Sequence, residues 1–353
     1  MSLRLLQQLF AAVGIGAAIG VVVSLGLIIS WSTLNVATYA VTASPLPTIT
    51  EIPTPMLAPT DTPTPLPTAT PTSTATPHPK PTRPPQPTQT PRPIIEHFLF
   101  GRPLALDAPA PAPNTLYLYG TTELGQYEVH HGVDFDRNPI GVPIYAVGDG
   151  IVVSAGDDRE LLCGANGKQV CGRFPNFYGW VTVIRLAQSY RGQTLFALYG
   201  HQDRIDIQVG QRVERGDAIG AVGMTGIAIG PHIQFEMRVG ANDYASTRNP
   251  MLWIAPLPGR GVLAGRFTDA DGALVRGAII DIYRVEEPTK FYRETETYGA
   301  DEQPDVNADD QLGENFVMND LPAGEYIVRV PGKTFSAHVV VPNGRLGWIE
   351  IGN

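Results

Sequence analysis

Histidine and carboxylate side chains recur near the ends of several expected strands, where they could act as ligands or move protons. His130 and Asp134 lie in the segment HHGVD, and an extended backbone would place both on one side. His201 ends the apolar run LYGH, and His232 and Gln234 in PHIQF again share a face. A single histidine of this kind is more often a hydrogen-bonded structural residue than a ligand. The joint arrangement favours one shared functional site.

Short β-branched runs, separated by Gly, Asp and Asn, must position these residues. The runs include IYAVGDGIVVSAG, GWVTVIRL, TLFALYGH and PHIQFEMRV, which are typical of strands and turns. No long segment between Gly101 and Arg248 shows a convincing helical period. We therefore predict an antiparallel β domain over residues 94–258, in which Gly132 allows close approach of two backbones.

The same segments resemble the lysostaphin/LytM-type endopeptidases from about Phe98 to Trp253. The family pattern HxGxD is present as HHGVD, its Tyr-x-His as LYGH, and its Gly-Pro-His-x-His-Phe-Glu as GPHIQFEMR. GVPIYAVGDGIVVSAG is similar to a strand pair of the family, and VGQRVERGDAIGAVGMTG to its Gly-rich hairpin. Because order and spacing both agree, the resemblance implies a LytM-type antiparallel β fold.

The resemblance also implies roles for the site residues. His130 and Asp134 would be zinc ligands, and His201 and His232 would flank the metal-bound water as base and transition-state stabilisers. The implied reaction is metal-assisted hydrolysis of a peptide bond, with three protein ligands leaving a fourth position for water. The implied substrates are the cross-link peptides of peptidoglycan. The third family ligand is the second His of His-x-His, which here is Gln234.

Gln234 leaves three interpretations open. Its neutral amide oxygen is a weaker zinc ligand than imidazole, so the metal should be held less tightly. The site could work with this unusual ligand, or another group or metal could complete it. Alternatively, the domain is catalytically degenerate and binds peptidoglycan or activates another wall hydrolase. Two tyrosines that precede HHGVD, Tyr119 and Tyr127, are candidates for stabilising the oxyanion, and the sequence does not choose between them.

Charge and cysteine content narrow the class of partner. The net charge is -9 and no stripe of Lys and Arg is present, so nucleic acid is not an expected partner. The only two cysteines, Cys163 and Cys171, flank a Gly- and Asn-containing segment that suits a short loop closed by a disulfide. Two free thiols are the alternative.

The N-terminal part of the chain predicts export. Residues 1–43 contain Leu9–Trp31, an uncharged stretch long enough to span a bilayer as a helix, which would anchor the chain in the membrane. A signal peptide cleaved near Ala40 is the alternative and would give a secreted protein. Residues 44–93 are rich in Pro and Thr and are expected to form a disordered linker. Both alternatives place the remaining chain on the extracytoplasmic side, in the cell envelope.

A second all-β unit is expected over residues 259–353. VLAGRFTDADGALVRGAIIDIYRV predicts two strands joined by an Asp-Gly turn, and DLPAGEYIVRV a turn that enters a strand. These segments resemble the prealbumin-like, Cna-B-like β-sandwich of carboxypeptidase regulatory-like domains, which implies a spacer or adhesion module without enzyme activity. The acidic segment DVNADDQLGEN is expected to be a solvated loop.

Overall fold

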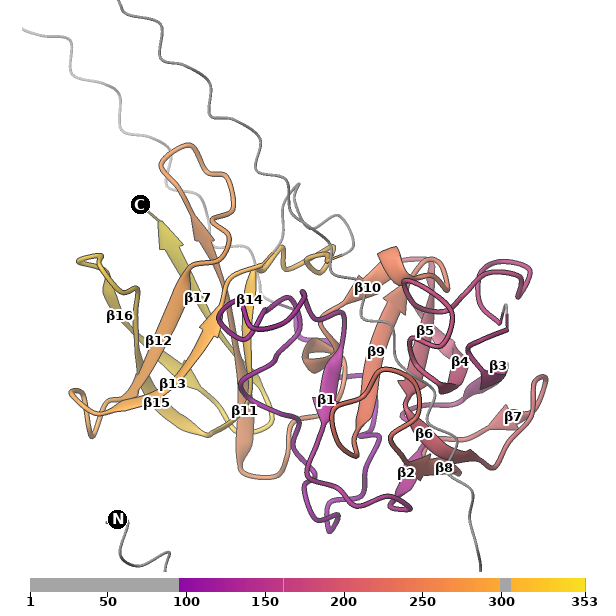
Figure 1. Cartoon of the computed structure of the whole chain (residues 1–353). Coiled ribbons are helices and arrows are strands. Elements are labelled where there is room, and N and C mark those ends of the chain that lie inside the picture. The colour runs from indigo at the N-terminus through magenta and orange to yellow at the C-terminus, as the bar shows by residue number, and fades with distance from the viewer. Residues whose placement is uncertain (1–94, 161, 299–305, 353) are drawn as a thin grey trace, which may run out of the picture. The chain divides into compact units, whose positions relative to one another are not determined.

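The computed structural model describes residues 95–160, 162–298 and 306–352. In these ranges regular structure is almost entirely β-strand, with two short 3-10 helices, η1 (Tyr244–Ser246) and η2 (Pro250–Leu252) (Figure 1). The predicted all-β class is therefore confirmed. No helix of the described ranges is long and apolar enough to cross a membrane. The predicted span Leu9–Trp31, the signal-peptide alternative and the linker 44–93 lie outside these ranges.

Ten strands, β1 to β10, form two antiparallel sheets that carry the predicted site. A seven-stranded sheet has the order β1-β9-β5-β4-β3-β7, with β10 also pairing β9, and a three-stranded sheet has the order β2-β8-β6. The strands are β1 (Val133–Phe135), β2 (Pro143–Tyr145), β3 (Gly150–Asp157), β4 (Trp180–Tyr190), β5 (Gln193–Gly200), β6 (Gln202–Ile205), β7 (Arg212–Val213), β8 (Ala218–Val222), β9 (Ile233–Val239) and β10 (Thr247–Arg248).

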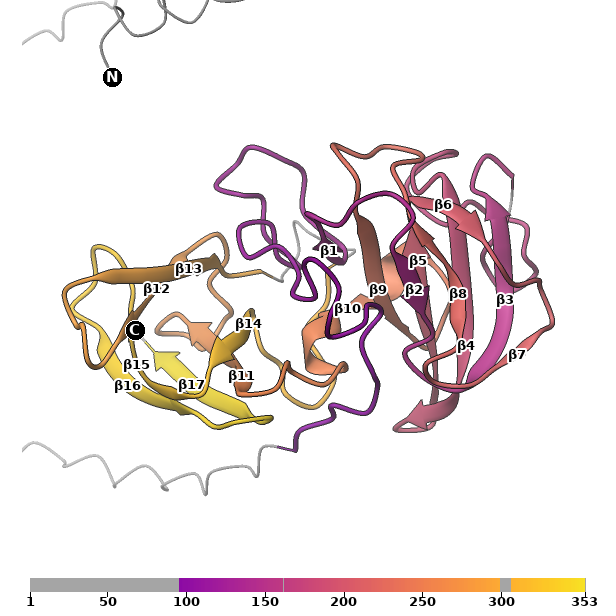
Figure 2. The ribbon, with the colours of Figure 1, turned by 90° about the horizontal axis from the view of Figure 1, so that it is seen from below.

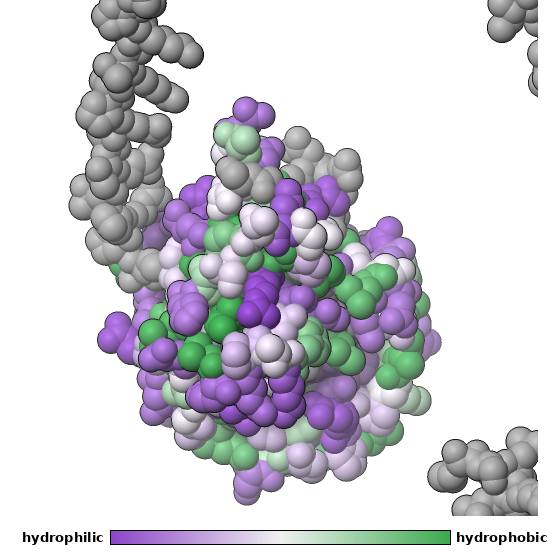
Figure 3. All heavy atoms as spheres, turned by 90° about the vertical axis from the view of Figure 1, so that its left-hand side faces the viewer, coloured by the Kyte–Doolittle hydropathy of each residue, from purple (hydrophilic) through white to green (hydrophobic). Residues whose placement is uncertain are grey.

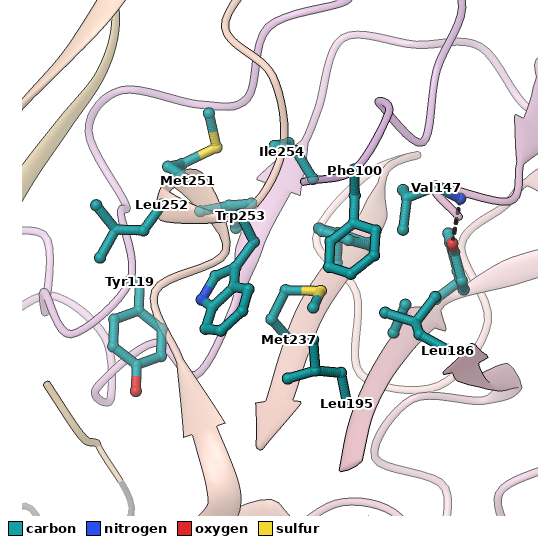
Figure 4. Close-up of a cluster of buried hydrophobic side chains, with 14 of the residues drawn as sticks. Phe100, Tyr119, Val147, Leu186, Leu195, Met237, Met251, Leu252, Trp253 and Ile254 are labelled. Atoms are coloured by element: carbon teal, nitrogen blue, oxygen red, sulfur yellow. Dashed lines mark hydrogen bonds between the residues drawn. The ribbon is translucent and has the colours of Figure 1, made fainter. Parts of the chain in front are cut away.

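The hydrophobic core beneath these sheets explains why the runs become strands. Every residue of β9 is buried, because β1, β5 and β10 pair with it and side chains pack on both of its faces. Trp253, Met237 and Phe100 lie together in the core, and the Val147 amide donates to the Tyr199 hydroxyl at 2.9 Å (Figure 4). Burial of aromatic side chains of this size is a major source of stability.

Seven further strands form a β-sandwich. One sheet has the order β14-β11-β17, in which β11 and β17 are parallel, and the other has the antiparallel order β13-β12-β15-β16 (Figure 2). The strands are β11 (Arg260–Thr268), β12 (Ile279–Arg284), β13 (Phe291–Glu296), β14 (Phe316–Pro322), β15 (Gly324–Arg329), β16 (Ser336–Val341) and β17 (Leu346–Gly352). The likeness to carboxypeptidase regulatory-like domains stays a prediction.

The sandwich has its own apolar core but also contributes to the core of the first sheets. Phe267, Ile282 and Phe316 are buried between its two sheets, whereas Val262 and Tyr298 belong to the cluster that contains Trp253. Hydrophilic and hydrophobic side chains are mixed over the face of the sandwich seen in Figure 3. The sandwich and the site-bearing domain therefore share one apolar cluster.

The expectation of a solvated acidic loop is wrong for its described part. Asp309 is 2% exposed and Glu314 is fully buried. Asp309 Oδ2 lies 3.3 Å from His97 Nε2, and Asp309 Oδ1 accepts a hydrogen bond from the Tyr190 hydroxyl at 3.1 Å. These partners lie far away along the chain, so composition alone could not reveal that the segment packs against the first sheets. Burial, and next the charge of Asp309, raise the pKa of Glu314 to about 8.

A disulfide joins Cys163 and Cys171, whose Cα atoms are 4.9 Å apart. Both cysteines are fully buried and pack with Tyr178, Val181 and Leu198. The two ends of the loop are therefore fixed to the sheet, while residues 165–169 between them are exposed.

Replacing both cysteines by alanine should lower the free energy of unfolding by about 2–3 kcal/mol, because the unfolded chain regains the entropy of an open loop. Urea unfolding of the two proteins measures this difference. Reductant should lower the stability of the wild type by a similar amount and leave the double variant unchanged. A wild type that is insensitive to reductant and equal in stability to the variant would contradict the prediction.

Candidate functional site

Three neighbouring strands bring the predicted site residues together. In the β1–β9 pair Asp134 lies directly opposite Gln234, and in the β5–β9 pair Gly200 lies opposite Gln234. His201 therefore follows β5 at the same level, and His232 directly precedes β9. His130 precedes β1 by a short turn. The predicted parity of HHGVD and PHIQF is thus realised at one edge of the sheet.

Each of the three histidines is oriented by a bond from its Nδ1 atom to a backbone carbonyl. The partners are Tyr117 O for His130 at 3.0 Å, Thr225 O for His201 at 2.8 Å and Gly230 O for His232 at 2.9 Å. A carbonyl only accepts, so Nδ1 carries the proton and a neutral ring presents the lone pair of Nε2. This is the tautomer that a metal ligand or a proton acceptor requires.

The Nε2 atoms of two of these histidines converge on one carboxylate. Asp134 Oδ1 lies 3.2 Å from His130 Nε2 and 3.7 Å from His232 Nε2. The His201 and His232 rings are adjacent, with centroids 4.6 Å apart. Neither His130 Nε2 nor Asp134 Oδ1 makes a hydrogen bond within the described structure, although both atoms are buried. Two lone-pair atoms this close need a cation between them, and a proton or a metal ion satisfies that need.

The electrostatics agree with a site for a cation. Burial alone would raise the pKa of Asp134, but the charges of His130, His232 and His201 lower it to about 2. Burial likewise opposes charging of His130, yet the charge of Asp134 and the hydrogen bond that a protonated His130 would donate to it raise the pKa of His130. His201 behaves differently, because burial and the neighbouring His232 lower its pKa to about 4. At neutral pH the site therefore holds an ionised Asp134 and a neutral His201.

The Gln234 amide presents its oxygen to the site. Its Nε2 donates to Glu236 Oε1 at 3.0 Å, and because an ionised carboxylate only accepts, Oε1 of Gln234 must be the atom that faces away from Glu236. Glu236 is fully buried and is paired with Arg238, whose NH2 group lies 2.8 Å from Oε2. The Tyr178 hydroxyl also donates to Glu236 Oε1. Burial opposes the charge of Arg238, but Glu236 and Tyr178 outweigh it and raise the Arg238 pKa.

The donor set fits a divalent cation. His130 Nε2, Asp134 Oδ1 and Gln234 Oε1 supply one nitrogen and two oxygens, which are ligand atoms that zinc accepts. The described residues contain no group of three or more His, Cys, Asp and Glu side chains in metal-binding geometry. The third donor proposed here is the amide of Gln234, which is not one of these four residue types.

Close approach of two backbones at the site requires a glycine. A Cβ atom on Gly132 would come within 2.6 Å of Phe235 O and 3.0 Å of Glu236 Cγ. The predicted role of Gly132 is therefore confirmed. His201 adopts a left-handed conformation with φ +59°, which is uncommon for a residue other than glycine. This conformation turns the chain from β5 to β6 at the site.

The site lies in a groove of about 430 Å³. Aromatic and aliphatic side chains line it together with polar and acidic ones. The apolar and aromatic set is Tyr117, Tyr127, Val129, Phe174, Phe177, Ile227, Ile229 and Tyr244, and Glu123, Glu128 and Asp136 are among the others. Of the two tyrosines predicted for the oxyanion, Tyr127 lines the groove, whereas Tyr119 is 1% exposed and bonds to Thr247 O at 3.0 Å. Of these two alternatives the structure disfavours Tyr119, because three bonds to β10 and to Asn307 hold its hydroxyl inside the core.

Sequence reasoning missed Tyr117. Its ring stacks on the His130 imidazole with centroids 4.1 Å apart and planes 2° apart, and its carbonyl orients the same imidazole. Burial raises the pKa of Tyr117, so its hydroxyl stays protonated. Tyr117 and His130 are an odd number of positions apart, so an extended strand would not place them on the same face. The chain turns back between them, and this turn brings the two rings together. The only hint in the sequence was that Tyr117 is two positions from Tyr119, a candidate for stabilising the oxyanion.

These strands, the groove and the convergent His and Asp side chains define a domain of the metallopeptidase class. Residues 128–246 match the model of the family described as Peptidase family M23. The predicted likeness to lysostaphin-type peptidases is confirmed.

Known relatives share this segment. The peptidoglycan DD-endopeptidase ShyA of Vibrio cholerae is 34% identical over 110 residues, which are 31% of this chain and 20% of that protein. Lysostaphin of Staphylococcus simulans is 29% identical over 136 residues, 38% of this chain and 23% of that protein. The solved catalytic domain of S. simulans lysostaphin is 28% identical, with a TM-score of 0.30, covering 38% of this chain and 86% of that one. The match thus spans less than a quarter of these two curated relatives.

The metal-free protein should keep His201 neutral to about pH 4. Because an unfolded histidine is protonated below about pH 6.5, the stability from this group is complete above that pH and is lost as pH falls toward 4. NMR titration after chelator dialysis would follow the imidazole signal that is missing in a His201→Asn variant. Asparagine tolerates the left-handed backbone. A midpoint near 6.5 for this signal would contradict the prediction.

Glu236→Gln should weaken metal binding at Gln234. A neutral amide at position 236 can accept or donate, so it no longer fixes the Gln234 oxygen toward the site, and Arg238 loses its buried counter-charge. We expect the zinc dissociation constant, measured by competition with a chromophoric chelator, to rise about 10–100-fold. Exposed Glu325→Gln is the matched control and should leave it unchanged. Equal affinity in both variants would show that Glu236 does not orient the ligand.

Proposed function

We propose that the M23 domain is a zinc endopeptidase that hydrolyses cross-link peptides of peptidoglycan in the cell envelope. The observation that carries the proposal is the convergence of His130, His232 and Asp134 within the groove, each histidine turning Nε2 toward the shared site. The match to family M23 and the names of the relatives, peptidoglycan endopeptidases among them, support the same reaction and substrate. The predicted membrane span and linker would hold this domain outside the cytoplasm.

His130, Asp134 and Gln234 are the residues that would hold zinc. When bound, zinc supplies a Lewis acid that polarises a peptide carbonyl and makes water more acidic. Tyr117 covers one face of the His130 ring and so shields it from solvent. The buried Glu236 keeps the Gln234 oxygen directed into the site.

His201 and His232 are the groups that move protons. In each, Nε2 is the nitrogen that can take up a proton, because Nδ1 donates to a backbone carbonyl. The Nε2 atom of His201 is unprotonated at neutral pH, so it can accept the proton of the attacking water. The proton must then reach the amine that leaves, and His232, adjacent to His201, lies in position to pass it on. Tyr127 on the groove wall is the remaining candidate for contacting the carbonyl oxygen.

Gln234 itself favours a second function, a non-catalytic module that binds wall peptides or activates another wall hydrolase. The amide oxygen is neutral, and a site with one histidine and one carboxylate holds zinc less tightly than one with an added imidazole. In that case the groove would retain its shape and its peptide affinity without turnover.

Zinc content and peptide release separate the two functions. The purified full chain should hold close to one equivalent of zinc by mass spectrometry of metals and should release peptides from purified peptidoglycan. His130→Ala should abolish zinc retention and lower the rate by about 10³-fold or more. A chain that holds less than a tenth of an equivalent of zinc and releases no peptide is not an enzyme of this kind.

Gln234→His provides the matched gain-of-ligand variant. Imidazole should tighten zinc binding by about tenfold or more relative to the wild type. If the wild type is inactive and this variant gains both zinc and activity, the natural chain lacks only one ligand. If neither is gained, the binding-module function is the better description.

A further inference from the structure

One wall of the groove is a segment without regular strands, residues 117–128, which we call the wall segment. Tyr117, Glu123, Tyr127 and Glu128 of this segment line the groove. It contains a tight turn in which Glu123 and Leu124 both have positive φ, +50° and +57°. Two consecutive residues of this kind are unfavourable without glycine, so contacts outside the turn must hold it in place.

Glu296 at the end of β13 supplies such contacts. Its Oε1 accepts hydrogen bonds from the Leu124 amide at 2.8 Å and the Thr122 amide at 3.2 Å, and its Oε2 accepts from the Thr122 hydroxyl at 2.8 Å. Glu296 is 9% exposed. Bonds to an ionised carboxylate are stronger than those between neutral groups, more so when they are shielded from water. The Glu296 carboxylate of the sandwich thus holds the turn of the wall segment in place through three hydrogen bonds.

Three consecutive residues anchor the start of the wall segment. Leu118 is 2% exposed and belongs to the apolar core of the sandwich. The Tyr119 hydroxyl accepts a hydrogen bond from the Asn307 amide at 2.9 Å. A Cβ on Gly120 would lie 2.4 Å from the Tyr298 ring, so the backbone is pressed against that ring. In Figure 1 the purple segment before β1 accordingly lies beside β13 and β14.

From these contacts we propose that the C-terminal β-sandwich is a structural part of the substrate groove, with Glu296 as a positioning residue for peptide binding. It holds Tyr127 and Glu128 where a bound peptide would meet them, and so lowers the entropy cost of binding. Asp134 does not depend on Glu296, because the β1–β9 pair fixes it, and His130 is held at the start of the wall segment by the bond from its Nδ1 to Tyr117 O. The inference rests on the proposed function for the identity of the peptide.

The test compares Glu296→Ala with exposed Glu325→Ala, which removes the same charge from β15 of the sandwich. In the full chain we expect Glu296→Ala to raise KM for a soluble cross-linked peptidoglycan fragment about tenfold, with kcat and zinc content within about twofold of wild type. Glu325→Ala should match the wild type. Hydrogen exchange at the amides of Thr122 and Leu124 should accelerate in Glu296→Ala alone.

Two further variants guard against a folding defect. Glu296→Gln keeps an acceptor and a donor and should restore part of the affinity. Thr122→Val removes the hydroxyl bond to Glu296 from the wall side, and with it the bond that the hydroxyl accepts from the Gly125 amide, leaves the sandwich untouched, and should raise KM in the same direction. Unchanged KM and unchanged exchange in Glu296→Ala overturn the proposal, and so does a KM that rises equally in Glu325→Ala.

Failure of the proposed function can be recognised separately. If the wild type releases no peptide, co-sedimentation with insoluble peptidoglycan replaces KM as the measurement. Weaker sedimentation of Glu296→Ala than of wild type and Glu325→Ala then supports the positioning role without catalysis. Equal sedimentation of all three proteins overturns it, as does a wild type that does not sediment at all.

Discussion

The antiparallel pairing of β1 with β9 is the contact on which the candidate site depends. It sets Asp134 opposite Gln234. His130 lies just before β1, and His232 lies just before β9. A shift of one residue in this register would turn Asp134 into the opposite face of the sheet and separate it from both histidines. Gly132 makes the pairing possible, because the neighbouring backbone of Phe235 leaves no room for a side chain there.

The buried ion pair of Glu236 and Arg238 links the site to parts of the domain that are distant in sequence. Glu236 and Arg238 alternate with Gln234 along β9, and all three side chains lie on the side that faces the loop closed by the disulfide. Arg238 reaches the carbonyl of Cys171 at 2.8 Å. Charges buried in this way are costly unless every lone pair has a partner. Tyr178 and the disulfide loop complete that set, so a loop remote in sequence helps to define which atom of Gln234 faces the groove.

Local spacing predicted the part of the site that strands determine. The parity of His130 with Asp134 and of His232 with Gln234 was predicted from an extended backbone, and the Nε2 atoms of His130 and His232 lie 3.2 and 3.7 Å from Asp134 Oδ1. Spacing could not predict Tyr117, because a turn and not a strand carries it to His130. It also could not predict that Glu296 reaches Thr122, since nothing in either segment signals the other. The burial of Asp309 was missed for the same reason, because its partners, His97 and Tyr190, come from distant parts of the chain.

Leu118 lies in the core of a sandwich whose strands come after every predicted site residue. Moreover, the central strand β11 pairs with β17, the last strand of the chain. A chain made from its N-terminus would therefore contain all of its site residues well before it could close the groove around them. The wall of the groove can therefore be completed only after β17 has been made and has paired with β11.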